Sequence, residues 1–476
     1  MNLTIDYNIS TYKMRGGLGA SWHTINDIHP LNNERYTIKV REDAPLGSAC
    51  GGNPPVTYSK AWNQLIGHAR WLGMNFCRVE LLQKSYNPQK GEFDWKSDDM
   101  LALYKILDWA EENDVDIFLQ QMALGAEWNA FPEIHPLISA PRNLKDHVES
   151  ISTLLIYLTK EKGYSCIKYF CMANEPPPPD GQGWGYWWEY GDHPGRIEDA
   201  WKLLREEFDL KGLPISISGP DWVFSNWLFL EKMECAAYFD SIDIHCYSGL
   251  SDKDEEGLSN WANWAHGNQK PFFLSEYGNM ELGWQGKNPA QKTFAAALSN
   301  AKSLMRGMRS GVDGFNKWSY TNRGDLDGQW QMVKTYDIDT HQYLEEAVPE
   351  NEAYYGFGII SRFFSKTSEV LYTTCEAADD VLMYNAVKSP GGKLSIFLVN
   401  LSEEELDVTI TVKNIPKGKL HLYQVTKEKV ISDDFKLNPV KSFIDNKQFT
   451  VSLPPQSIST CTENELYHTD AGITLN

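Results

Sequence analysis

The chain has 476 residues, 42% of them hydrophobic, which is enough to bury the core of one large domain and a smaller one. Its formal net charge of −20, with no block of lysine or arginine, excludes a nucleic-acid surface and favours a neutral substrate. All apolar runs stay short of the roughly 18 residues that a membrane span requires, so we expect a soluble chain with no membrane partner.

The first residues of the chain are polar. Residues 1–14 lack the charged and apolar regions of a secretory signal, so we expect a cytoplasmic protein, or a secreted one whose leader has been removed. Within this stretch Leu3–Tyr12 alternates between apolar and polar residues, as a strand does. We assign residues 1–15 to an N-terminal strand that pairs with sheet structure at the other end of the chain.

Residues 16–365 alternate between short apolar runs and longer amphipathic stretches, the pattern of repeated βα units. The amphipathic stretches include Leu101–Glu112 and Asp146–Thr159, where apolar residues recur every three or four positions. The expected strands are Gly17–Ser21, Asn75–Glu80, Asp116–Met122, Tyr169–Asn174, Ile215–Gly219, Ile242–Tyr247, Phe272–Tyr277 and Gly314–Tyr320. Eight such units close a TIM (β/α)8 barrel.

After Phe364 the pattern changes to short alternating strands separated by Gly, Pro, Asn and Asp. These strands are expected at Glu369–Cys375, Val381–Val387, Lys393–Leu401, Leu406–Val412, Lys419–Val425 and Gln448–Leu453. Residues 366–476 therefore form a β-sandwich domain. The predicted fold is an α/β chain: a TIM barrel with a C-terminal β-sandwich, joined by the N-terminal strand.

Two strand ends carry candidate catalytic carboxylates. Functional side chains of such barrels project from the C-terminal ends of the strands. The fourth strand runs into Asn174-Glu175-Pro176, and the seventh ends at Glu276-Tyr277. Cleavage of a glycosidic bond with retention needs one carboxylic acid and one carboxylate about 5–5.5 Å apart. Glu175 and Glu276, on opposite sides of the barrel mouth, suit that chemistry.

This pairing of Asn-Glu-Pro on the fourth strand with a lone Glu on the seventh resembles the clan A glycoside hydrolases. The added sandwich and its N-terminal strand are most similar to families 30 and 39 of that clan. The resemblance implies that Glu175 is the general acid/base and Glu276 the nucleophile. It also implies roles for other strand-end residues that bind substrate or hold the nucleophile: Arg78, Asn174, His245, Tyr247 and Trp318.

The resemblance also implies what these residues do. Arg78 braces the nucleophile and Tyr247 donates to it, while His245 lines the sugar subsite. Asn174 hydrogen-bonds the 2-hydroxyl of the sugar, and Trp318 forms the floor of the sugar subsite. We expect Glu276 to stay charged beside Arg78 and Tyr247, and the pKa of Glu175 to be raised.

Further aromatic and polar residues follow other strand ends and are candidates for sugar contacts: Trp22, His23, Trp128, Asp221 and Trp184. Trp184 belongs to the aromatic run 183–190, which is either a stacking platform for the leaving-group sugar or a hydrophobic plug. No zinc-type His/Cys spacing or third glycine of a dinucleotide motif is present, so we expect no metal and no cofactor.

The sequence thus predicts a retaining β-glycoside hydrolase that degrades a neutral β-linked oligosaccharide or polysaccharide through a covalent glycosyl-enzyme. Two alternatives stay open: a transglycosidase on the same scaffold, and a non-catalytic carbohydrate-binding protein. The sequence leaves the sugar, the linkage, endo or exo action and the oligomeric state open.

Overall fold

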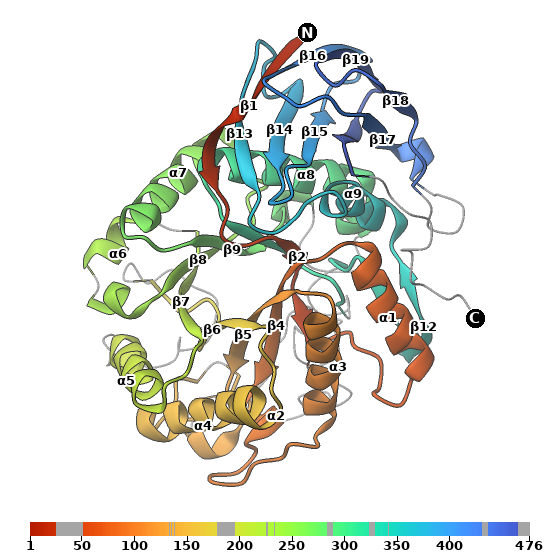
Figure 1. Cartoon of the computed structure of the whole chain (residues 1–476). Coiled ribbons are helices and arrows are strands. Elements are labelled where there is room, and N and C mark those ends of the chain that lie inside the picture. Colours follow the sequence, from red (N-terminus) through yellow and green to blue (C-terminus); the bar gives the residue numbers. More distant parts are fainter. Residues whose placement is uncertain are drawn as a thin grey trace.

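A barrel and a β-rich domain are stacked on each other in the computed structural model (Figure 1). The structure describes residues 1–24, 51–132, 134, 136–137, 139–178, 196–224, 227–232, 234–282, 289–322, 329–340, 342–430 and 437–464. No helix among these residues combines the length and apolar character needed to cross a bilayer.

The barrel is a closed ring of parallel strands. Its segments are β2 (Leu18–Ala20), β3 (Trp22–His23), β4 (Phe76–Leu82), β5 (Asp116–Ala123), β6 (Ile167–Cys171), β7 (Ser216–Val223), β8 (Ser241–Cys246), β9 (Phe272–Tyr277) and β10 (Gly314–Lys317). β2 pairs with β10 and β3 pairs with β4, so these two halves of one strand close the ring. The expected barrel of eight strands is confirmed.

Helices cover the outside of the barrel in the order that the sequence predicts (Figure 1). They are α1 (Ser59–Trp71), α2 (Gln83–Tyr86), α3 (Asp98–Glu112), α4 (Leu144–Ile156), α5 (Arg196–Lys211), α6 (Leu228–Lys232), α7 (Asp252–Gly267), α8 (Phe294–Ser310) and α9 (Asn351–Ser361). Local chemistry sets their ends: α3 starts after Ser97, whose hydroxyl accepts the Met100 N–H, and α8 ends at Gly311 with φ of 94°.

Shorter turns complete the barrel layer and the side domain. They are η1 (Glu127–Asn129), η2 (Tyr157–Glu161, one π-turn), η3 (Glu234–Tyr238), η4 (Met280–Leu282), η5 (Pro289–Lys292) and η6 (Lys427–Lys429). A hairpin of β11 (Val333–Asp337) and β12 (Gln342–Pro349) follows the last barrel strand and packs on α1. This hairpin was not anticipated from the sequence.

Alternation along the barrel strands decides which side chains reach the interior. In β8, Ile242, Ile244 and Cys246 belong to the apolar core between the strands and the helices. Asp243 and His245, at the positions between them, are buried polar residues that bond to side chains of other strands. Because side chains of a strand alternate between its faces, the same sequence builds a core on one face and a polar lumen on the other.

Close approach of the backbones closes the ring at its first strand. A Cβ built at Gly19 would lie 1.7 Å from the carbonyl oxygen of Phe76, so only glycine fits between β2 and β4 at this point.

The side domain is one sheet that curls over itself into a sandwich. Its strands are β1 (Asn2–Lys13), β13 (Glu369–Cys375), β14 (Leu382–Lys388), β15 (Leu394–Asn400), β16 (Leu406–Lys413), β17 (Leu420–Thr426), β18 (Lys441–Phe443), β19 (Gln448–Leu453) and β20 (Ser457–Thr462). β1 lies between β13, to which it is antiparallel, and β16, to which it is parallel. The predicted joining strand is confirmed, whereas β18 and β20 were not predicted.

Strands β14 and β15 connect the two domains through the same alternation. Leu382 and Tyr384 point into the core of the sandwich, whereas Met383 and Val387 belong to the core that continues into the barrel. Asn385 donates to the carbonyl of Met305 on α8 at 2.6 Å. The sandwich is therefore fixed to the outer helices of the barrel.

Candidate active site

Two glutamates converge at the mouth of the barrel. Glu276 lies near the C-terminal end of β9, and Glu175 follows β6 in a left-handed conformation with φ of 46°. One oxygen of each carboxyl group and a ring nitrogen of His245 lie within 4.8 Å of one another. Carboxyl groups this near to each other can act on one anomeric carbon, as the pair in retaining glycosidases does.

Arg78 connects Glu276 to two neighbouring polar side chains. Its Nη1 contacts both Glu276 and Glu80, and its Nη2 donates to Asn174 Oδ1 at 2.7 Å. Burial would lower the pKa of this guanidinium, but Glu276 and Glu80 outweigh that effect and raise it. Arg78 is therefore a permanent buried cation held by β4.

His245 and Tyr247 approach from β8 and the residue that follows it. Tyr247 donates its hydroxyl proton to Glu276 Oε2, while His245 Nδ1 lies 2.7 Å from Glu175 Oε1 and 3.3 Å from Glu276 Oε2. Burial would lower the pKa of His245, but the carboxylates of Asp221 and Glu276 outweigh burial and hold it well above its usual value. His245 is thus an imidazolium in contact with both glutamates.

The pKa of Glu276 shifts in a direction that the sequence did not predict. Burial, assisted by Glu175 and Glu80, raises the pKa of Glu276 to about 8 against the opposing effect of Arg78 and His245. The Glu276 side chain is 5% exposed and that of Glu175 is 16% exposed, so desolvation falls mainly on Glu276. Burial thus opposes the charge that Arg78 and Tyr247 were expected to keep on Glu276.

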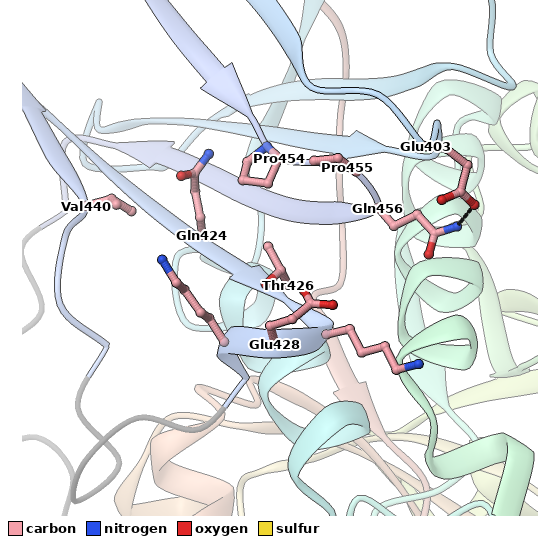
Figure 2. Close-up of a pocket in the computed structure, with 10 residues that line it drawn as sticks. Glu403, Gln424, Thr426, Glu428, Val440, Pro454, Pro455 and Gln456 are labelled. Atoms are coloured by element: carbon pink, nitrogen blue, oxygen red, sulfur yellow. Dashed lines mark hydrogen bonds between the residues drawn. The ribbon is translucent and has the colours of Figure 1, made fainter.

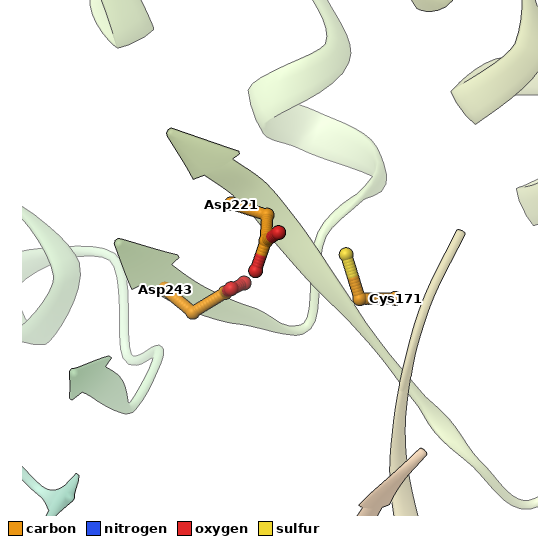
Figure 3. A group of neighbouring side chains, drawn as sticks. All are labelled: Cys171, Asp221 and Asp243. Carbon is orange, nitrogen blue, oxygen red and sulfur yellow. The ribbon is translucent and has the colours of Figure 1, made fainter. Parts of the chain in front are cut away.

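A second group of acids lies beneath the mouth, where the carboxyl groups of Asp221 and Asp243 face each other and the Cys171 sulfur points toward them (Figure 3). Burial and the neighbouring Asp221 raise the pKa of Asp243 well above its usual value. Burial alone would raise the pKa of Asp221 as well, but His245 and Arg78 bring it below its usual value. Burial keeps the thiol of Cys171 protonated by raising its pKa. The opposite pKa directions of the two aspartates favour a proton on Asp243 and a charge on Asp221.

Asp221 was expected to touch substrate, but the structure places it below the site. Its side chain is 0% exposed and accepts hydrogen bonds from Gln120 Nε2 at 2.7 Å and the Glu175 backbone N–H at 3.2 Å. His245 Nε2 lies 3.1 Å from its other oxygen. Asp221 therefore orients the ring of His245 and the backbone of Glu175, because the strand turns its side chain into the barrel interior.

An apolar wall flanks the glutamates. Trp318, 5% exposed, packs with Leu82, Met122 and Leu137, and Tyr247 packs against this cluster together with Trp330. The buried amine of Lys317 donates to the carbonyls of Trp318 and Trp330, both at 3.0 Å. Trp318 is therefore held rigidly at the end of β10, where the sequence predicted a sugar-stacking residue.

Sequence reasoning missed Glu80, which lies between Arg78 and His23. Its Oε1 contacts Arg78, and its Oε2 lies 2.8 Å from His23 Nδ1. The signal was present, because residues two apart on a strand share a face and Arg78 had already been placed in the site. The ring of His23 packs edge-on against Trp318 at a centroid distance of 5.0 Å.

The outcome differs among the other three predicted site residues, which are Trp22, Trp128 and Trp184. Trp22 was expected to line a subsite but is 0% exposed and packs against Trp62 and Trp109 in the core, because alternation turns it away from His23. Trp128 is half-buried, and its indole N–H donates to the carbonyl of Asn87 at 3.0 Å. Trp184 lies outside the described residues.

A hollow on the side domain is separate from this site. Figure 2 shows it between Gln424 and Thr426 of β17 and the turn at Pro454 and Pro455, with Gln456 bonded to Glu403. It contains none of the glutamates, cations or aromatic residues described above. The convergent acid–base chemistry is found at the barrel mouth.

No protein-family model matches the sequence, and neither does any curated protein. Solved structures do match in fold. A family 30 glycoside hydrolase endoxylanase from Clostridium papyrosolvens superposes with a TM-score of 0.66 and 12% identity, over 98% of this chain and 100% of that one. A family 30 subfamily 8 xylanase from Clostridium acetobutylicum gives 0.65 and 15% over 98% and 100%. A family 39 β-xylosidase from Caulobacter crescentus gives 0.61 and 11% over 98% and 100%. The chain shares the two-domain fold of these proteins.

Proposed function

We propose that this chain is a retaining β-glycosidase of the clan A type, with Glu175 as general acid/base and Glu276 as nucleophile. The observation that carries the proposal is the convergence of these two carboxyl groups at the barrel mouth within 4.8 Å, with His245 touching both. The fold shared with xylanases and a β-xylosidase supports the same assignment. We also propose that the catalytic barrel spans residues 16–365, with the joining strand at residues 1–15 and the sandwich at residues 366–476.

The reaction follows from the positions of the groups. Glu175 gives a proton to the leaving oxygen while a Glu276 oxygen bonds to the anomeric carbon, and the glycosidic C–O bond breaks. Water then attacks that carbon, Glu175 takes the water proton, and Glu276 leaves as a carboxylate. Arg78 and Tyr247 hydrogen-bond the departing carboxylate, which stabilises the charge that returns to it.

The first step needs Glu276 ionised and Glu175 protonated. His245 Nδ1 contacts both glutamates, so the imidazolium can give a proton to Glu175 and regain one from Glu276. That transfer leaves the acid on Glu175 and the carboxylate on Glu276, as the first step requires.

The charge distribution supports a neutral substrate. The buried cations Arg78 and His245 are both engaged by carboxyl groups of Glu80, Glu276, Glu175 and Asp221. A uronic acid placed beside them would meet additional negative charge, with no free cation among the described residues of this cluster. We therefore propose a neutral β-linked glycan as the substrate.

A panel of neutral aryl β-glycosides and β-linked oligosaccharides tests this function. We expect hydrolysis of at least one member, with the β-anomer as the first product seen by proton NMR. If the α-anomer forms first, the nucleophile assignment is wrong. Binding without any turnover would identify a carbohydrate-binding protein, and transfer to an added sugar in preference to water would identify a transglycosidase.

A further inference from the structure

Glu80 is a fully buried carboxylate that serves two partners at once. One oxygen contacts Arg78 Nη1, the same nitrogen that contacts Glu276, and the other lies 2.8 Å from His23 Nδ1. The side chains of Glu80, Arg78 and His23 are all 0% exposed. Glu80 therefore lies between the nucleophile's cation and a histidine that packs against Trp318.

We propose that Glu80 is a positioning residue that tunes the charge on Glu276 through Arg78 and fixes His23 so that its Nε2 accepts a hydrogen bond from a hydroxyl of the bound sugar. The inference rests on the proposed glycosidase function and adds a recognition contact to it.

The proposed effect of Glu80 on the charge of Glu276 follows from Arg78, whose Nη1 contacts both carboxyl groups. A guanidinium nitrogen that serves two carboxylates stabilises the charge on each less than it would stabilise one alone. Glu80 also stands close enough to repel negative charge on Glu276. The other ionisable or charged groups that face Glu276 among the described residues are Arg78 on β4, Glu175 after β6, His245 on β8 and Tyr247 after β8. Glu80 is the member of this set that also contacts His23.

The second half follows from tautomer chemistry. Burial would raise the pKa of Glu80, but Arg78 and His23 hold it below its usual value, so its carboxylate accepts hydrogen bonds and has no proton to give. The shared hydrogen must then lie on His23 Nδ1, and in that tautomer Nε2 carries the lone pair that the proposed contact requires.

Nε2 of His23 is buried and has no hydrogen-bond partner in the part of the chain that the structure describes. Buried polar atoms in native proteins nearly always have a partner. The ring makes an edge-type contact with Trp318, the residue on which the sugar is proposed to stack. A hydroxyl group of a sugar stacked there would be a donor of the required kind.

The pH profile of kcat/KM tests the first half. In Glu80→Gln the repulsion on Glu276 is removed and Arg78 Nη1 is left with one carboxylate, so the acid limb should move to lower pH by about one unit. Glu80→Asp retains the charge and should keep the limb near the wild-type position. An unmoved limb in a folded, active Glu80→Gln enzyme would overturn this half.

Deoxy and deoxyfluoro aryl glycosides test the second half, because a C–F group cannot donate. At one ring position, both analogues should lose on the order of tenfold or more in kcat/KM with the wild type. In His23→Asn these penalties should shrink several-fold, and comparison of the two enzymes cancels the intrinsic reactivity of each analogue. Penalties that are the same in both enzymes would overturn the contact. A fluoro analogue that retains the activity of the parent would show that Nε2 donates.

Asp313→Asn is the matched control, since Asp313 is also a fully buried carboxylate that holds a histidine, His266 Nε2 at 2.7 Å. Its pH limb and analogue penalties should equal those of the wild type. If Glu80→Gln does not fold, Glu80→Ser replaces it in the pH test, because that variant also removes the charge. The analogue penalties of His23→Asn then decide whether His23 contacts the sugar. A wild type that hydrolyses nothing refutes the proposed function itself, whereas turnover without these shifts refutes only the role of Glu80.

Discussion

The two ends of the barrel each bury a carboxylate against a histidine, yet they use the pair differently. At the end where the strands begin, Asp313 accepts the backbone N–H groups of Arg15 at 3.0 Å and Phe272 at 2.9 Å as well as His266. Both of its oxygens are thus committed to holding chain segments together. At the end where the strands finish, Glu80 bonds only to side chains, and its histidine retains an unused nitrogen.

This contrast shows how a structural acid differs from one that supports chemistry. Because backbone N–H groups bond to the oxygens of Asp313, its side chain joins β9 to the segments before β2 and β10. This contact stabilises the fold. The acids at the mouth instead share cations and protons with one another, so their charge states are coupled. Substitutions at the two ends should therefore affect different properties.

The largest effect is expected at the mouth, for Glu276→Ala. Loss of the nucleophile should reduce kcat by about 10⁵-fold, as removal of a covalent catalyst does in other hydrolases. Added azide should restore turnover by filling the vacated space and should yield the α-glycosyl azide, which NMR identifies. Substantial activity without azide would contradict the proposed difference between the two ends of the barrel, because Glu276 would then not be essential.

Glu175→Ala should have a smaller effect that depends on the substrate. With a poor leaving group, loss of the general acid should lower kcat by about 10²–10⁴-fold. With a dinitrophenolate leaving group, which needs little protonation, the first step should be nearly unaffected. A plot of rate against leaving-group pKa should thus be steeper for the variant than for the wild type. Equal slopes would remove Glu175 from the acid role.

At the opposite end, Asp313→Asn should leave kcat/KM unchanged and lower the free energy of unfolding by about 1–3 kcal/mol, because a carboxylate that accepts three hydrogen bonds is replaced by a weaker acceptor. Chemical denaturation measures the stability and the aryl-glycoside assay the activity. A fall in kcat/KM in fully folded protein would show that the two ends are coupled.

The smallest effect concerns the pH dependence of stability. The pKa of Glu276 is raised from 4.5 to about 8, so its protonated form favours the fold below pH 4.5 and that contribution is lost as pH rises toward 8. Glu276→Gln stays neutral throughout. Its melting temperature relative to the wild type should therefore rise between pH 5 and pH 8. A difference that stays constant over this range would show that Glu276 is already ionised at pH 5.

The sequence predicted the strands well because period-two alternation and turn residues are local signals. The same alternation could have predicted that Glu80 shares a face with Arg78. It could also have predicted that Trp22 lies in the core, because its neighbour His23 faces the lumen. The upward shift in the pKa of Glu276 could not be predicted, since it depends on how deeply distant segments bury that side chain. β18 and β20 were missed because β18 is short and the buried positions of β20 are mostly Ser and Thr.

The pairing of β1 has a consequence for how the protein is made. Leu3 lies beside Cys375 on one neighbouring strand and beside Ile410 on the other. During synthesis, the ribosome must therefore complete every barrel strand before this segment meets either partner, and such distant contacts form slowly. We expect nascent chains that stop before β13 to carry Leu3 and Ile5 uncovered, as a binding site for chaperones.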